Sequence, residues 1–284
     1  MSSKNRLADI AREHLPTDVA RQWTDLLKPA VRLAHAADGD AIVGHLGGEA
    51  ALPPDTPWPV WDGHGPLSLW LTLDCAALPT AELALPESGR LLFFLFDGQL
   101  CESSSPYIGD DDPGSRGAHQ VVHVPEGTPT RPRPGPAALH HQIEAEPLTA
   151  SVIWTAPQYP TDLEDWHVRF GAPDEATSRA LHGEEFEDTL DLWGRATHQV
   201  GGHPFAPQTP VEEDLAAHVV FAGTDRSAAE LRREVARWRL LLQFMPDHRT
   251  RLWCGDTYYL YWFITVEDLA ARRWDRARLL AQDT

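Results

Sequence analysis

Two histidines in the segment HQVGGHPFAPQTP (198–210) have the residue type for metal binding or acid–base chemistry. His198 and His203 are five positions apart around a Gly-Gly pair, which excludes the i,i+4 pair of a metal-binding helix and leaves a loop-borne pair open. A third ligand would come from one of three other side chains: Asp214, His218 or Asp256. Because no carboxylate or thiolate lies close to either histidine in sequence, we predict no metal site, with these two histidines as its only weak candidates.

The same histidines, together with Asp74 and Asp256, are the candidates for acid–base or ligand-binding groups in a cleft. Trp58 is one of several tryptophans that could line an aromatic pocket, because indole supplies apolar area and an N–H donor. Packing in a core is the more frequent use of such a side chain. The chain contains no GxxxxGK[ST], GxGxxG after a strand, GxSxG or HExxH, so phosphate-loop, dinucleotide, esterase and zincin chemistry lack support, and we expect no cofactor.

Composition limits the classes of partner and the cellular compartment that we expect for this protein. The 284 residues carry a formal charge of −18 and no long basic run, which argues against nucleic acid as a partner. No apolar stretch approaches the roughly 18 residues of a membrane span, and the N-terminus lacks the apolar core of a signal peptide. Three cysteines without CxxC spacing suggest reduced thiols. These features predict a soluble, cytoplasmic protein, and the scarcity of lysine beside arginine suggests a bacterial source.

Hydrophobic patterning predicts an α+β fold. Two short helices open the chain, strands follow at 30–37, 41–48, 67–75, 90–98 and 118–124, and a further strand is expected at 148–154. Helical segments are predicted over 161–192 and 227–238, where Ser227 and Glu230 have capping-box spacing. Strands at 239–245 and 257–265, a short helix and a last strand complete the chain. The proline-rich stretch 125–136 is the best candidate boundary.

An internal echo suggests a duplication. GHLGGEAALPPDTPWP (44–59) resembles HQVGGHPFAPQTP, and each is followed by an apolar strand, a loop, and an aromatic strand. We therefore predict N-terminal helices over 1–28, a first β-rich half over 29–136, and a second half over 137–284 with a helical insert, in one compact unit. The halves would be mostly antiparallel and related by a pseudo-two-fold axis, with a cleft between them. Chance recurrence of strand-loop-strand order is the alternative.

Several blocks resemble the YwqG-like bacterial family of unknown function, from about residue 40 to the C-terminus. The matching positions fall in three blocks: Gly47, Gly48, Pro54, Trp58 and Pro59; His198, Gly202, Pro204 and Gln208; and Trp253, Gly255 and Asp256. The resemblance adds Gln208 to the candidate binding residues. His203 stands where the family usually has tyrosine, so anything particular to this chain is expected there. The resemblance implies a fold and no established reaction, and some members are thought to be immunity partners of secreted toxins.

Two functions remain open. The preferred one is a protein-binding or immunity-type module whose acidic faces, including EEFEDTLD (184–191), meet a basic protein partner. The alternative is a small-molecule-binding protein or enzyme that uses the cleft between the halves. The two differ in whether the candidate polar groups converge on a cavity.

Overall fold

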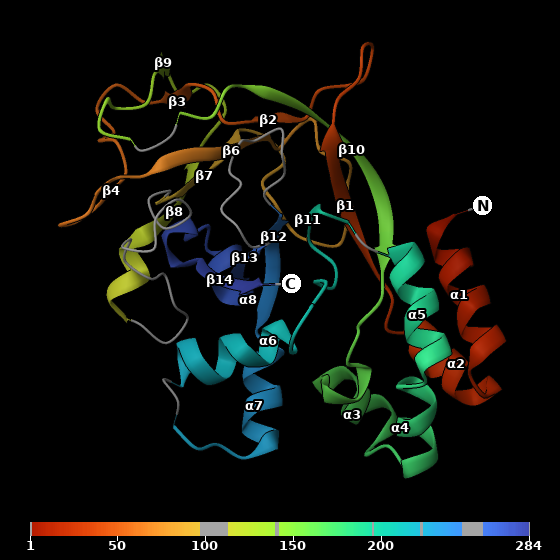
Figure 1. Ribbon diagram of the computed structural model, residues 1–284. Coiled ribbons are helices and arrows are strands. Elements are labelled where there is room, and N and C mark those ends of the chain that lie inside the picture. The colour runs from red at the N-terminus through yellow and green to blue at the C-terminus, as the bar shows by residue number, and fades with distance from the viewer. Residues whose placement is uncertain are drawn as a thin grey trace.

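The structure is a computed structural model of the mixed α+β class, in which ten strands form one antiparallel sheet and helices cover parts of it (Figure 1). It describes residues 2–96, 113–139, 142–194, 196–221, 224–245 and 258–283. The α+β prediction is therefore confirmed. In the described ranges, no helix has both the length and the apolar character needed to cross a membrane.

The strands of the main sheet are β1 (Lys28–His35), β2 (Gly44–Leu46), β6 (Ser68–Asp74), β7 (Arg90–Leu95), β8 (His119–Val124), β10 (Glu146–Thr155), β11 (His198–Val200), β12 (Trp238–Phe244), β13 (Tyr258–Thr265) and β14 (Arg278–Asp283). Their order across the sheet is β14-β13-β12-β11-β1-β10-β2-β6-β7-β8. Two small sheets pair β3 (Ala50–Leu52) with β9 (Arg131–Arg133) and β4 (Val60–Trp61) with β5 (Gly65–Pro66).

The helices are α1 (Ser3–His14), α2 (Thr17–Thr24), α3 (Glu164–Phe170), α4 (Glu175–Leu181), α5 (Glu184–Gly194), α6 (Val211–Asp214), α7 (Ala228–Val235) and α8 (Val266–Ala270). The other helical segments are the 3₁₀ helices η2 (Pro113–Ala118), η3 (Pro160–Asp162) and η5 (Trp274–Arg276) and the π-helical η4 (Leu215–Val220). The capping box predicted for α7 is present, with the Ser227 side chain accepting from Glu230 N and the Glu230 side chain accepting from Ser227 N.

The centre of the sheet joins segments that are far apart in the sequence. β1 and β10 pair antiparallel along their length, from Lys28 opposite Thr155 to His35 opposite Leu148. On the other side of β1 lies β11, and on the other side of β10 lies β2. Strands from residues before and after the proline-rich stretch are thus interleaved. Within that stretch β9 pairs with β3, and the Arg133 side chain donates to the carbonyl oxygen of Thr56.

The main core lies between two parts of this curved sheet, which we call its arms. One arm is formed by β2, β6, β7 and β8, and the other by β11, β12, β13 and β14. Phe93 and Trp262 meet edge to face with ring centroids 5.7 Å apart, and Trp70 and Phe244 do so at 5.4 Å. Each pair joins β6 or β7 to β12 or β13, so residues from both arms bury one another. Such burial removes apolar surface from water and is the main favourable contribution to folding.

A second core holds the helical layer. α1 and α2 pack with α3 to α5 around Trp23, Trp166 and Phe186, all of which are buried. Figure 1 shows these helices grouped beside the ends of β1 and β10. The N-terminal helices therefore rest on the insert between β10 and β11, which brings both segments next to the start of β1.

The turn after β11 has a conformation that favours glycine. Gly201 and Gly202 have φ values of 70° and 74°, and the Gly47-Gly48 pair after β2 has values of 56° and 79°. A side chain at Gly202 would also place its Cβ 2.5 Å from Thr155 Oγ1 and 2.7 Å from Ala30 Cβ. Glycine therefore lets this turn approach β1 and β10 closely, and it fixes the position of the next residue, His203.

Candidate functional site

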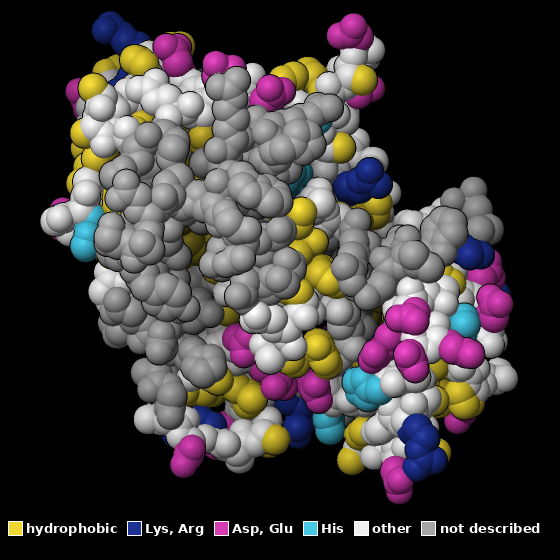
Figure 2. Space-filling view, in the orientation of Figure 1, with side chains coloured by type: hydrophobic (Ala, Val, Ile, Leu, Met, Phe, Trp, Pro, Cys, Tyr) yellow, Lys and Arg dark blue, Asp and Glu magenta, His cyan; other side chains and the backbone are white. Residues whose placement is uncertain are grey.

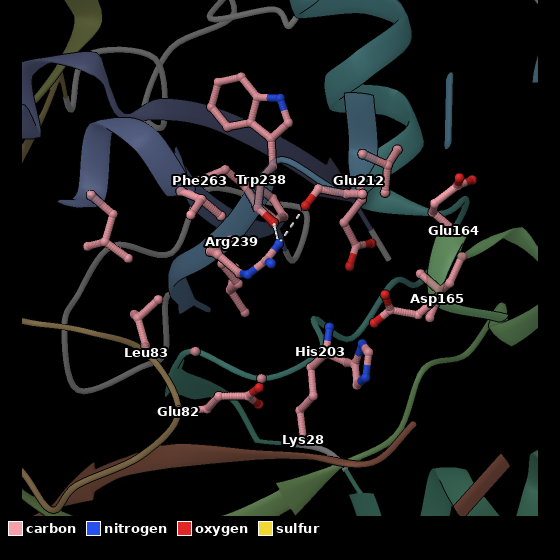
Figure 3. Close-up of a pocket in the computed structure, with 18 of the residues that line it drawn as sticks. Lys28, Glu82, Leu83, Glu164, Asp165, His203, Glu212, Trp238, Arg239 and Phe263 are labelled. Carbon is pink, nitrogen blue, oxygen red and sulfur yellow. Dashed lines mark hydrogen bonds between the residues drawn. The ribbon is translucent and has the colours of Figure 1, made fainter. Parts of the chain in front are cut away.

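A cavity of about 280 Å³ lies beside this turn, bordered by the start of β1, by the loop around residue 83 and by elements of the second half of the chain (Figure 3). Its volume is near the lower end of the range for small-molecule sites, which runs from about 300 to 1,000 Å³. Figure 3 shows Lys28, His203, Glu212 and Arg239 around the opening. The cavity therefore combines opposite charges with an imidazole.

The ring of His203 is held in one orientation. Its Nε2 lies 2.8 Å from the carbonyl oxygen of Leu26, and its backbone N–H donates to Thr155 Oγ1 at 2.8 Å. Because a carbonyl accepts only, Nε2 carries the proton, and Nδ1 of the neutral ring is left as an acceptor. Nδ1 makes no hydrogen bond to any residue that the structure describes, and His203 borders the cavity.

The pKa of His203 is lowered to about 3, first by burial and then by the positive charge of Lys28. The Leu26 carbonyl has a smaller upward effect, and Arg239 lowers the pKa least. The side chain is only 4% exposed. At neutral pH the imidazole is therefore uncharged. Since an effective general base has a pKa near the working pH, His203 is suited to accepting a hydrogen bond from a bound group.

Lys28 approaches the cavity from the first position of β1. It is half-buried, and its ammonium forms no ion pair with a carboxylate in the described ranges. Thr155 Oγ1 donates to the Lys28 carbonyl at 3.1 Å and accepts from His203 N, which ties the strand to the turn. Figure 3 shows the Lys28 side chain extending beside the His203 ring.

Arg239 and Glu212 border the cavity from β12 and α6. The Arg239 Nη1 donates to the carbonyl oxygens of Ala236 and Trp238, each at 2.8 Å, which holds the guanidinium in place (Figure 3). Burial raises the pKa of Glu212, and Lys28 acts in the opposite direction. Lys28 therefore lies within electrostatic reach of both His203 and Glu212.

Two glutamines hold the turn that carries His203. Gln199 Nε2 donates to the carbonyl oxygens of Gly201 and His203, at 3.1 and 2.7 Å. On the neighbouring strand, Gln243 Nε2 donates to Ala196 O at 2.7 Å while its Oε1 accepts from Phe205 N at 2.8 Å. Both side chains are fully buried, so their hydrogen bonds prevent buried backbone groups from being left unpaired.

A small acidic chamber adjoins the main cavity. It has a volume of about 20 Å³, enough for roughly one water molecule, and Glu213, Asp162 and His203 are among its lining residues. The pKa of Glu213 is raised to about 7, mainly by burial and then by Asp162 and the adjacent acidic residues. Burial also raises the pKa of Asp162. Negative charge is therefore costly in this chamber.

The other predicted site residues lie elsewhere. His198 is buried and stacks on Phe244 with centroids 4.5 Å apart, while Asp74 Oδ1 accepts from Ala76 N in the turn after β6. Trp58 donates to the Leu67 carbonyl at 2.8 Å, and Gln208 is exposed in the loop after β11. Asp256 lies outside the described residues. Of the five described candidates, His203 borders the main cavity, and a binding role for any of the five stays a prediction.

Metal binding gains no geometric support. Within the described ranges, no three His, Cys, Asp or Glu side chains are grouped as a metal site requires. His203 Nε2 already bonds Leu26 O, and Asp214, one of the suggested third ligands, accepts from Gln282 Nε2 at 2.7 Å. The side chain of His218, another suggested ligand, is outside the described residues.

Sequence reasoning missed Lys28, Glu212, Arg239 and Gln199 as parts of the site. None belongs to a spaced motif, and the scarcity of lysine suggested only a bacterial source. The contacts that place them span long separations, such as the 177 positions between Leu26 and His203. A lysine at the first position of a strand carries no local signal of this arrangement.

Comparison with known proteins gives a family and no activity. No curated protein matches the chain. The profile of a domain of unknown function, DUF1963, matches residues 44–282, which contain most of the sheet and every element of the cavity except the start of β1. The chain therefore belongs to the DUF1963 family.

Proposed function

We propose that this protein binds a small polar molecule in the cavity beside His203. The observation that supports this proposal is that two polar residues border the same cavity of about 280 Å³. One is His203, whose Nδ1 is a fixed acceptor, and the other is Lys28, a cation without an ion pair in the described structure. A few polar groups held in place beside an apolar wall are the usual composition of a ligand site. The low pKa of His203 favours binding over acid–base catalysis at this ring.

A plug in the cavity mouth tests this proposal. Ala84 is exposed and borders the cavity, so Ala84→Trp is expected to fill the space with little effect on the core. Ala77→Trp is the matched control, because Ala77 is exposed and does not border it. A metabolite screen by thermal shift and calorimetry should give a ligand that binds the wild type and the control and is lost in the plug variant. If a ligand binds Ala84→Trp and the wild type equally well, its binding site is not this cavity.

A protein partner is the second candidate, favoured by the surface of α4 and α5. Glu184, Glu185, Glu187 and Asp188 are exposed on α5, and Figure 2 shows Asp and Glu side chains gathered over this part of the molecule. Such a surface suits a basic protein partner, as in an immunity-type module, through electrostatic complementarity.

Replacing the four acidic residues of α5 by their amides tests this second proposal. A partner captured from the host should be released by moderate salt and should not be retained by the variant, because charge attraction is screened within about 10 Å at 0.1 M salt. The same capture with Ala84→Trp should be unaffected. Salt-resistant capture by the amide variant would contradict a role for this surface.

We also propose that the fold arose by internal duplication. Equating β1, β2, β6, β7 and β8 with β10, β11, β12, β13 and β14 leaves the strand order unchanged when it is read from either edge. The β6–β7 and β12–β13 pairs each have one register irregularity, at Trp70 and at Leu241. Gly47-Gly48 and Gly201-Gly202 then occupy equivalent turns with similar φ values.

We also propose a narrower family assignment and a cellular setting for the protein. We place the chain among YwqG-like members of the family, supported by the Gly-Gly turns and the aromatic strand in each half. A bacterial, cytoplasmic setting is supported by the arginine-rich, lysine-poor composition and by the reduced, buried Cys75. Cell fractionation with an antibody to the native protein tests the compartment.

A further inference from the structure

The cavity holds two positive charges in a protein whose net charge is −18. Lys28 and Arg239 both border it, both lower the pKa of His203, and neither forms an ion pair with a described carboxylate. Arg239 uses Nη1 for two backbone carbonyls, which leaves its other N–H groups for a further acceptor. This side of the cavity is therefore equipped to receive an anionic group.

The glycine turn adds to the anion-binding side. In the equivalent turn of the first half, Gly47 N donates to Trp70 O and Gly48 N donates to Ile143 O, both at 2.9 Å. Gly201 and Gly202 border the cavity, and their N–H groups make no such bond within the described chain. Backbone N–H groups of this kind are common ligands of carboxylate and phosphate oxygens.

Next to these cations, His203 and Glu212 offer acceptor groups for a donor that carries positive charge. His203 Nδ1 accepts only, and the half-buried Glu212 carboxylate has lost part of its hydration, which raises its pKa. Glu82 and Asp165, both exposed, add negative charge at the opening (Figure 3). An ammonium group would satisfy His203 Nδ1 and Glu212 together, whereas a polyanion such as a nucleotide would be repelled.

The remaining wall is apolar. It is formed by residues of α7, β12, β13 and α8: Val235, Trp238, Leu240, Phe263 and Leu269. A ligand with one aliphatic or aromatic side chain would bury apolar surface there, at roughly 25 cal/mol per Å². The cavity volume matches a small molecule of this kind more closely than an extended chain.

From this arrangement we infer that the ligand is a free zwitterionic α-amino acid with an apolar side chain. Its carboxylate lies between Lys28 and Arg239, its ammonium group donates to His203 Nδ1 and Glu212, and its side chain lies against Trp238 and Phe263. This inference rests on the proposed ligand-binding function and specifies the chemical class of its ligand.

Calorimetry with three related probes tests the inference. L-Leucine carries both charges, N-acetyl-L-leucine lacks the ammonium group, and L-leucinamide lacks the carboxylate. L-Leucine should bind, and each blocked analogue should bind at least about tenfold more weakly, since each loses a charge-assisted hydrogen-bonded contact. Equal binding of N-acetyl-L-leucine and L-leucine would overturn the zwitterion inference while leaving a ligand site in the cavity.

Two variants assign the charged groups. Lys28→Gln should weaken L-leucine by about tenfold and L-leucinamide much less, whereas Glu212→Gln should weaken L-leucine and spare N-acetyl-L-leucine. Lys4→Gln is the control, because Lys4, the chain's other lysine, lies over the Trp154 ring away from the cavity. Equal loss for both probes in Lys28→Gln would overturn the assignment of the carboxylate.

Absence of binding is also decisive. If neither L-leucine nor L-phenylalanine gives heat or a thermal shift at millimolar concentration with folded protein, the amino-acid inference is wrong. The proposed ligand-binding function is then judged separately, by whether a different metabolite binds the wild type and is lost in Ala84→Trp. Circular dichroism of each variant confirms that a lost signal is not a lost fold.

Discussion

At the scale of single residues, His203 shows how burial selects one role for a side chain. Its Nε2 is hydrogen-bonded to Leu26 O, and burial together with two nearby cations opposes protonation, so the ring stays neutral and offers one acceptor. The neutral ring lowers the stability of the folded protein only at acidic pH. Because the unfolded chain binds a proton near pH 6.5 and the folded chain near pH 3, stability falls as the pH drops through this window.

His203→Gln should therefore reduce the acid sensitivity of folding. Over about pH 6 to 4 the wild type should lose about 1.4 kcal/mol of unfolding free energy per pH unit through this group, and the variant should lack that share of the slope. Urea denaturation at several pH values measures it, and the slope stays informative even if the variant is less stable overall. His182→Gln, at an exposed histidine, is the control. An unchanged slope in His203→Gln would contradict the low pKa.

Glu213 has the opposite dependence on pH. Its pKa is raised from 4.5 to about 7, so the folded state is penalised as the pH rises from about 4.5 towards 7 and the penalty is complete above it. Glu213→Gln should stabilise the protein by about 1–3 kcal/mol at pH 8, and the gain should vanish near pH 4. Thermal and urea unfolding at both pH values check it, with the exposed Glu13→Gln as the control for net charge. A gain of equal size at pH 4 would exclude this explanation.

At the scale of elements, the β11–β12 pair supports the site through two amide side chains. Gln199 and Gln243 are opposite one another across the strands, and together they bond backbone groups on both sides of the turn. This turn carries His203 and closes the space between β1 and α6. The glutamines are therefore positioning residues, whose removal should affect the cavity without touching a ligand.

Gln243→Leu should cost about 2–4 kcal/mol of stability, because Ala196 O and Phe205 N each lose a buried partner. Gln120→Leu, at an exposed position of β8, should change stability by less than about 0.5 kcal/mol. Urea unfolding measures both. If the two substitutions cost the same, the buried amide does not hold the turn.

Local sequence patterns predicted the helices and strands better than they predicted the residues of the candidate site. The apolar runs LSLWLTLD and RLLFFLFD predicted β6 and β7, which are buried on both faces, and Ser227 with Glu230 predicted the start of α7. The glycine pair before His203 predicted a turn. Periodicity says nothing of which strands are neighbours, so the pairing of β1 with both β10 and β11, and with it the position of Lys28, could not be predicted from the sequence.

At the scale of the whole molecule, the interleaved centre makes the two halves interdependent. β1 has its partners in the second half, and the main core contains residues of both arms. Separating the halves would expose core residues of each to water. The full chain should consequently unfold as one cooperative unit.

Dividing the chain after residue 136 tests this dependence. Fragments 1–136 and 137–284 should each lack a cooperative thermal transition when expressed alone, and co-expression should restore a single transition close to that of the intact protein. Circular dichroism and differential scanning calorimetry give the comparison. A sharp transition in the isolated first fragment would show that its half folds independently.

The pairing of Lys28 with Thr155 also affects how the chain folds while it is being synthesised. β1 leaves the ribosome before β10, and Thr155 follows 127 residues after Lys28. At about 5–20 residues per second, the N-terminal strand waits roughly 6–25 s with its backbone unpaired. A strand edge exposed for so long invites association between nascent chains, so the yield of folded protein should depend on the speed of translation and on chaperones that shield the first strand until the second arrives.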